Sequence, residues 1–251
     1  MSSTLIAGAE EAVLVDTLVT LDQVDALAEW VRSFGKRLTG VYITHGHQDH
    51  WIGLARIQEH FPQARGIATP EVVERARFEA TNPQLSAYWK AIFPGELPQT
   101  AVLPEPLNSD QFELEGQVLR AVSVGQGDTE FSTVLHVPSA AAVVSGDVVY
   151  NGVHMMTGET DEKSREAWIA SLDAVAALNP KIVVAGHKSV GAPDLPESIG
   201  ASQQYLRDFS RIVNEQGSVE DVVDAMLKLH GDRDNPRALW HSARTAVAER
   251  G

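Results

Sequence analysis

Four side chains that commonly bind metal ions fall within six residues of this chain, at His45, His47, Asp49 and His50. They follow an apolar run, 41–43, that predicts a buried strand ending in a loop. Imidazole and carboxylate are the nitrogen and oxygen ligands that zinc and similar ions prefer, and Gly46 lets a tight loop direct several of them to one point. The alternative is a polar loop with surface histidines. The position at a strand end favours a metal site, because open α/β proteins build their sites there.

The charge of the chain limits its partners. It has 34 acidic and 20 basic residues, for a net charge of −14 over 251 residues. A surface that binds nucleic acid or an anionic membrane must be basic, so both classes of partner are disfavoured. A small anionic substrate remains compatible, because a metal ion supplies positive charge locally.

Cysteine is absent from the sequence, which excludes disulfides, thiolate ligands and a cysteine nucleophile. Any metal must therefore be held by His, Asp, Glu or Gln. The N-terminus lacks the basic and apolar regions of a signal peptide, and no apolar run is long enough to cross a bilayer. We expect a cytoplasmic protein.

The order of predicted elements indicates an α/β fold in one domain, 1–251, with a helical tail from about 195. Predicted strands lie at 12–16, 41–44, 66–68, 112–114, 117–124, 132–137, 142–145 and 181–185. Predicted helices lie at 20–34, 53–60, 69–80, 162–178, 199–215, 219–229 and 237–250. The segment 81–98 is interrupted by prolines, and two structures are compatible with it: an irregular segment that packs apolar side chains near the site, or a short helix that packs in the core. The tail either covers the core or forms a contact in a homo-oligomer.

Polar side chains recur where several predicted strands end, at Asp16, His45, His47, Asp49, His50, Asp147 and His187. This set offers more ligands than one tetrahedral ion uses, which indicates two metal ions. Together, the motif His45-x-His47-x-Asp49-His50, the later Gly146-Asp147 and the final Gly186-His187 resemble the metallo-β-lactamase superfamily. The order of elements agrees with that family over nearly the whole chain.

The resemblance implies a four-layer αβ/βα sandwich with a binuclear metal centre, here with a shortened N-terminal edge. His45 and His47 would hold the first metal, while Asp49, His50 and His187 would hold the second. Asp147 would bridge the two ions. Asp16 would orient the segment 45–50, called here the histidine loop, through hydrogen bonds.

One position departs from the family pattern. The third histidine of the first metal site is replaced by Gln126, in the loop 125–129. An amide oxygen is a weaker ligand than imidazole, so this site should be altered, with Asp128 or water as candidate replacements. The number of bound ions, one or two, is therefore left open. Zinc is the expected metal, with iron or manganese as alternatives.

The expected activity is hydrolysis of a small organic substrate by a metal-bound hydroxide, with Asp49 orienting or deprotonating the water. The substrate classes considered are lactone, ester, thioester and β-lactam. Trp51, Trp89 and His154 are the candidate substrate contacts. The alternative function is a metal-poor binding or regulatory protein of the same fold, which the replacement at Gln126 motivates.

Overall fold

The computed structural model describes residues 1–249, and the chain divides into two compact units. The first unit comprises Met1–Ser123 and Thr133–Ala140, and the second comprises Val124–Ser132 and Ala141–Gly251. Arg250, the last residue of the predicted tail, lies outside the described residues. The single domain expected over 1–251 stays a prediction.

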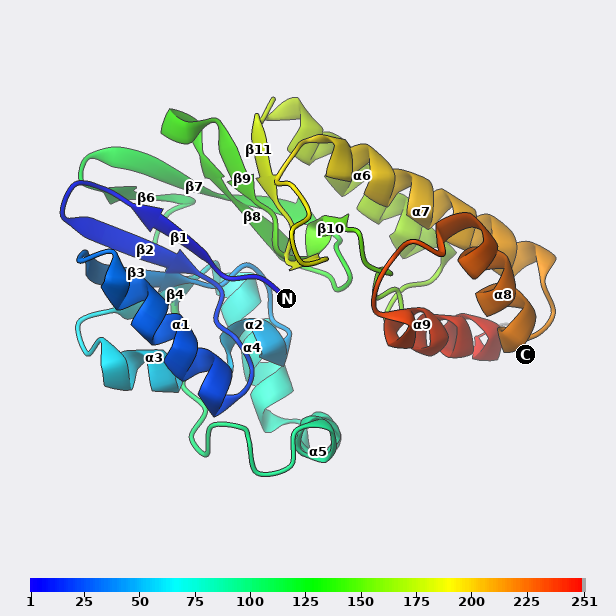
Figure 1. Ribbon diagram of the computed structural model, residues 1–251, viewed down its shortest axis with the longest axis horizontal. Coiled ribbons are helices and arrows are strands. Elements are labelled where there is room, and N and C mark those ends of the chain that lie inside the picture. Colours follow the sequence, from blue (N-terminus) through cyan, green and yellow to red (C-terminus); the bar gives the residue numbers. More distant parts are fainter. Residues whose placement is uncertain (250–251) are drawn as a thin grey trace. The chain divides into compact units, whose positions relative to one another are not determined.

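A five-stranded sheet in the order β1-β2-β3-β4-β5 organises the first unit (Figure 1). β1 is antiparallel to β2, and the later neighbours are parallel. Its strands are β1 (Thr4–Ala7), β2 (Glu11–Val15), β3 (Arg37–Tyr42), β4 (Arg65–Ala68) and β5 (Glu105–Pro106). Because β2 and β3 are parallel, their carboxyl ends lie at the same edge of the sheet. Asp16 follows β2 there, and the histidine loop follows β3.

Helices bury their apolar faces against this sheet. They are α1 (Leu21–Ser33), α2 (Gln48–Trp51), α3 (Leu54–His60) and α4 (Pro70–Thr81). The shared core includes Leu14 and Val41 from the sheet, Val31 from α1, Leu54 from α3 and Val72 from α4. Full burial of such a side chain stabilises the fold by about 1.5–3 kcal/mol, so this core fixes the frame of the histidine loop.

Of the two structures considered for 81–98, the chain forms a helix, α5 (Pro83–Ile92). The Asn82 side chain accepts hydrogen bonds from the backbone N–H groups of Gln84 and Leu85, at 2.9 and 3.3 Å. Pro83 occupies the first helical position, where its missing N–H costs nothing. The proline that suggested irregular structure is therefore part of a helix start.

Three further strands follow in the order β8-β7-β6, namely β6 (Gln111–Leu114), β7 (Gln117–Gly125) and β8 (Ser132–Val137). The tight turn between β6 and β7 uses positive φ at Glu115 and Gly116. The Glu115 carboxylate accepts backbone hydrogen bonds from Ala9, Glu10 and Glu11. This contact ties the β6–β7 turn to the turn between β1 and β2.

The second unit contains two short pairs of parallel strands and four helices among its described residues. The strands are β9 (Ala142–Val144) with β11 (Ile182–Val184), and β10 (Tyr150–Asn151) with β12 (His187–Lys188). The helices are α6 (Glu162–Ala177), α7 (Glu197–Glu215), α8 (Val219–His230) and α9 (Pro236–Ala248). Consecutive helices pack together. The helices α7, α8 and α9 lie where the sequence predicted helices at 199–215, 219–229 and 237–250, as far as residue 248. No helix within residues 1–249 has both the length and the apolar character that crossing a bilayer requires.

Candidate metal centre

The histidine loop leaves the end of β3 and turns directly into α2, which begins after His47. His45 and His47 lie in the loop, while Asp49 and His50 lie in α2. The ring centroids of His45 and His50 are 4.0 Å apart, and those of His45 and His47 are 5.1 Å apart. Within each of the pairs His45–His47, His45–His50 and Asp49–His50, candidate ligand atoms lie within 4.8 Å of one another. The loop therefore gathers three imidazoles and one carboxylate into a small volume.

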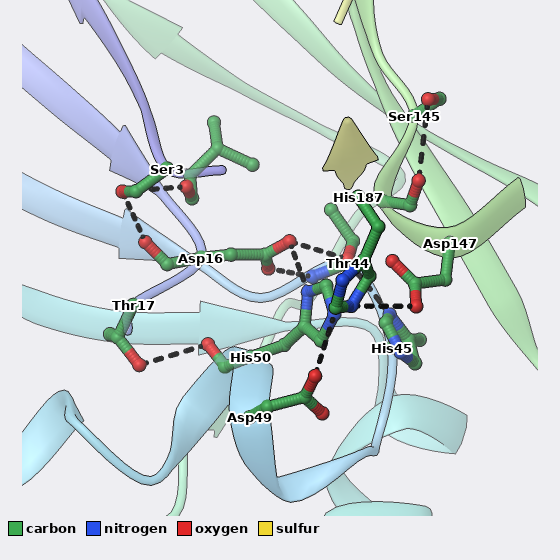
Figure 2. Close-up of polar contacts among 12 residues, drawn as sticks. Ser3, Asp16, Thr17, Thr44, His45, Asp49, His50, Ser145, Asp147 and His187 are labelled. Atoms are coloured by element: carbon green, nitrogen blue, oxygen red, sulfur yellow. Dashed lines mark hydrogen bonds and ion pairs between the residues drawn. The ribbon is translucent and has the colours of Figure 1, made fainter. Parts of the chain in front are cut away.

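Asp16 fixes this loop from the end of β2. Its carboxylate accepts hydrogen bonds from the Thr44 N–H and from the Thr44 hydroxyl, both at 2.8 Å, and lies 2.8 Å from Nδ1 of His50 (Figure 2). The Asp16 backbone has φ of 57°, a left-handed conformation that aspartate tolerates at a strand end. These contacts orient His50, whose side chain is completely buried.

The same carboxylate acts on His45 through Thr44. The Thr44 hydroxyl donates to Asp16, so its remaining contact, with Nδ1 of His45 at 3.1 Å, must be one in which it accepts. The proton then sits on Nδ1 of His45, and the contact with Asp16 places the proton of His50 on Nδ1 as well. Both rings keep Nε2 as the nitrogen with a lone pair, which is the state that a metal ion requires.

A second brace comes from β8. The Thr133 N–H and hydroxyl both donate to the Thr44 carbonyl, at 3.0 and 2.6 Å. The Tyr42 hydroxyl lies 2.7 Å from the Thr133 hydroxyl, and burial raises the pKa of Tyr42, which keeps it protonated. Thr44 is therefore held on both sides.

In the second unit, Asp147 and His187 form a pair. Nε2 of His187 lies 3.3 Å from Oδ2 of Asp147, and the Tyr150 hydroxyl donates to the same oxygen at 2.7 Å. The Tyr150 and His187 rings stack with their centroids 5.6 Å apart, because β10 and β12 pair these two residues directly. A Cβ atom at Gly186 would lie 2.2 Å from Oδ1 of Asp147, so only glycine permits this approach.

Gln126 and Asp128 differ in their surroundings. The Gln126 amide is half-buried and donates to the Gly127 carbonyl at 3.0 Å. Asp128 is 2% exposed, and its Oδ2 lies 3.5 Å from the Tyr150 hydroxyl. Tyr150 thus contacts both Asp128 and Asp147. Sequence reasoning missed Tyr150, because a tyrosine three residues after an aspartate carries no signal of its own.

Trp51, a candidate substrate contact from the sequence, is buried in the core. It is 1% exposed, belongs to the core of the first unit and donates from its indole N–H to the Gly46 carbonyl at 2.8 Å. This hydrogen bond holds the histidine loop against the core. Trp89 is half-buried on α5 and stacks on Phe93.

His154 is completely buried in the second unit, where its Nδ1 lies 3.1 Å from the Tyr205 hydroxyl. Burial lowers the pKa of His154 to about 4, so its ring is neutral at pH 7. A neutral ring buried against tyrosine indicates a packing role in this conformation, in place of the substrate contact considered from the sequence.

The donor set fits a metal ion of the zinc type. The first unit offers converging imidazoles, two of them with the proton placed on Nδ1, and the second offers a histidine beside a buried aspartate. Zinc accepts these imidazole and carboxylate ligands, and the carboxylate of Asp16 orients two of the rings as such ligands require.

The comparisons with known proteins agree with this chemistry. The sequence profile of the metallo-beta-lactamase superfamily matches residues 2–187, and the chain belongs to that superfamily. It has the α/β fold of that family, and the family supports a metal-dependent hydrolase as the general class. No curated protein matches the sequence.

Solved structures share the fold at low sequence identity. A metallo-beta-lactamase family protein from Thermus thermophilus is 19% identical, with a TM-score of 0.70 over 98% of this chain and 87% of its own. A metallo-beta-lactamase from Pontibacter korlensis is 18% identical, with a TM-score of 0.64 over 81% and 86%. FIM-1 from Pseudomonas aeruginosa, solved in its mono-zinc form, is 18% identical, with a TM-score of 0.61 over 82% and 83%.

Proposed function

We propose that this protein is a metal-dependent hydrolase of small organic substrates. The proposed metal ligands are His45, His47, Asp49, His50, Asp147 and His187. The observation that carries the proposal is the arrangement around Asp16, which leaves Nε2 of both His45 and His50 as a lone-pair donor. Such preorganisation is what metal ligands require and what a merely polar loop does not need.

A bound zinc ion supplies a Lewis acid that lowers the pKa of water and polarises a carbonyl oxygen. Asp49, partly exposed at the start of α2, is the proposed general base and accepts the proton of the attacking water on its carboxylate. The proposed substrates are lactones, esters, thioesters and β-lactams. A water activated by the metal and by Asp49 can hydrolyse such an acyl bond without a protein nucleophile. The negative net charge of −14 favours such substrates over nucleic acid.

The test combines metal content with a substrate screen. Protein produced with zinc, iron and manganese available is analysed for metals and then assayed on chromogenic lactones, esters, thioesters and β-lactams. We expect about one or two equivalents of metal per chain and hydrolysis of at least one class that a chelator abolishes. Metal below about half an equivalent, with no hydrolysis, would contradict the proposal.

The second candidate is a metal-poor binding or regulatory protein with little activity. Gln126 favours it, because an amide that donates to its neighbouring carbonyl is a poor substitute for a histidine ligand. The same metal analysis separates the two functions. Zinc as the metal, one or two ions per chain and a cytoplasmic location all remain parts of the proposal.

A further inference from the structure

The histidine loop is held by α4 as well as by Asp16. A Cβ atom at Gly46 would lie 2.2 Å from Cγ of Arg75 and 3.0 Å from the Ala76 nitrogen, so the loop backbone packs directly on this helix. The Gln48 side chain donates to the Glu79 carbonyl at 3.1 Å. Glycine at position 46 is therefore required by the approach of α4.

Glu79 brings a charged group into this contact. Its side chain is 2% exposed, and its Oε1 lies 3.2 Å from the Arg75 guanidinium, one helical turn earlier. A carboxylate oxygen of Glu79 also lies within 4.8 Å of a ring nitrogen of His47. Burying a carboxylate is costly, and Arg75 offsets much of that cost. The ion pair thus allows a carboxylate to sit beside His47.

The three imidazoles of the loop divide into two groups according to the carboxylate that lies near each ring. Asp16 contacts His50 directly and His45 through the Thr44 hydroxyl. Within the first unit, the carboxylate grouped with His47 is that of Glu79, on a different element. A histidine that binds metal usually has a carboxylate, carbonyl or water beside its other nitrogen, which fixes its tautomer.

We infer that Glu79, supported by Arg75, is the positioning carboxylate of His47. It acts on His47 as Asp16 acts on His45 and His50. The contribution of Glu79 to metal affinity rests on the proposed function, but its effect on the orientation and tautomer of the His47 ring does not.

The first test uses the full-length protein without added metal and needs no variant. Long-range ¹H–¹⁵N NMR spectra report the tautomer of each histidine ring. We expect His47 to populate a single tautomer, since a nearby carboxylate selects the ring nitrogen that carries the proton. A His47 ring that populates both tautomers as free imidazole does would overturn the inference.

The second test compares Glu79→Gln with Glu74→Gln. Glu74 lies on the same helix, and its side chain is 72% exposed, so it controls for loss of one acidic charge on α4. In Glu79→Gln we expect the His47 tautomer to change, the His50 signals to stay as in the wild type, and zinc affinity to fall by about 10- to 100-fold. Glu74→Gln should change none of these.

Two outcomes separate this inference from the proposed function. If Glu79→Gln leaves the His47 tautomer unchanged, Glu79 is only the structural partner of Arg75 and the inference is wrong. If the tautomer changes but the wild-type protein neither binds metal nor hydrolyses any substrate, the inference holds and the hydrolase proposal fails.

Discussion

Tyr150 has one hydroxyl proton, yet two buried carboxylates lie against it. The proton goes to Asp147, at 2.7 Å, while Asp128 lies at 3.5 Å. Carboxylates that share one neighbour repel each other, and a nearby cation favours the charged form of both. We therefore propose Asp128, and not Gln126, as the residue that compensates for the missing histidine ligand.

At this scale the prediction concerns Asp128→Asn and Gln126→Ala. Asn keeps the shape of the side chain but removes its charge, so zinc affinity should fall by at least about tenfold. Gln126→Ala should leave affinity within about twofold, because the amide donates to the Gly127 carbonyl. Isothermal titration with zinc measures both. Equal losses in the two variants, or a loss in Gln126→Ala alone, would contradict this assignment.

The residues that the sequence revealed are those that carry metal chemistry at a recognisable spacing. His45, His47, Asp49 and His50 are adjacent in sequence, and Asp16 follows a predictable strand. Thr133, Tyr150 and Glu79 could not be predicted, because their importance arises only when β8, β10 and α4 fold beside other segments. The burial of Trp51 could not be predicted either, because an aromatic residue next to a motif is as compatible with core packing as with a substrate contact.

At the scale of elements, one carboxylate joins two turns. Glu115, in the turn between β6 and β7, accepts three backbone hydrogen bonds from the turn between β1 and β2. The N–H groups of Glu10, Glu11 and Ala9, in that order, lower the pKa of the Glu115 carboxyl. Because this pKa is lower in the folded state, the charged form stabilises the fold above the ordinary pKa of glutamate. That stabilisation is lost as the pH falls through the lowered value.

We predict that Glu115→Gln reduces stability at neutral pH and makes it less dependent on pH below about pH 4.3, the ordinary pKa of glutamate. Urea unfolding at a series of pH values measures this difference. Glu113→Gln, on the exposed side of β6, is the matched control and should follow the wild-type curve. If both variants keep the acid dependence of the wild type, the contact contributes nothing to stability.

Elements were predictable where local signals were strong. The helices predicted at 20–34 and 162–178 are present as α1 and α6: a capping box of Thr20 and Gln23 starts α1, and Trp168, Leu172 and Val175 are buried on α6. The helix α5 was one of two alternatives for its segment, because prolines are compatible with an interruption as well as with a helix start. The short strands β5, β10 and β12 have two residues each, too few for any periodic pattern.

At the scale of the molecule, the chain combines two compact units, each of which contains some of the residues proposed as ligands. His45, His47, Asp49 and His50 belong to the first unit, while Asp147 and His187 belong to the second. The family was predictable from the motifs, because their residues and order are specific. The division into two units was not, since no change in composition marks it.

The last prediction follows from this division of ligands. An ion that binds only the folded state stabilises it, and at about 100 times its Kd the gain is about 2.7 kcal/mol. For a chain of this size, zinc should therefore raise the Tm by about 5 to 10 °C, and a chelator should reverse the change. His47→Ala and Asp147→Ala should each lose most of this zinc-dependent shift, although the two substituted residues belong to different units. Thermal unfolding followed by circular dichroism, with and without zinc, measures the effect. A full shift in Asp147→Ala would mean that the histidine loop binds zinc without the second unit.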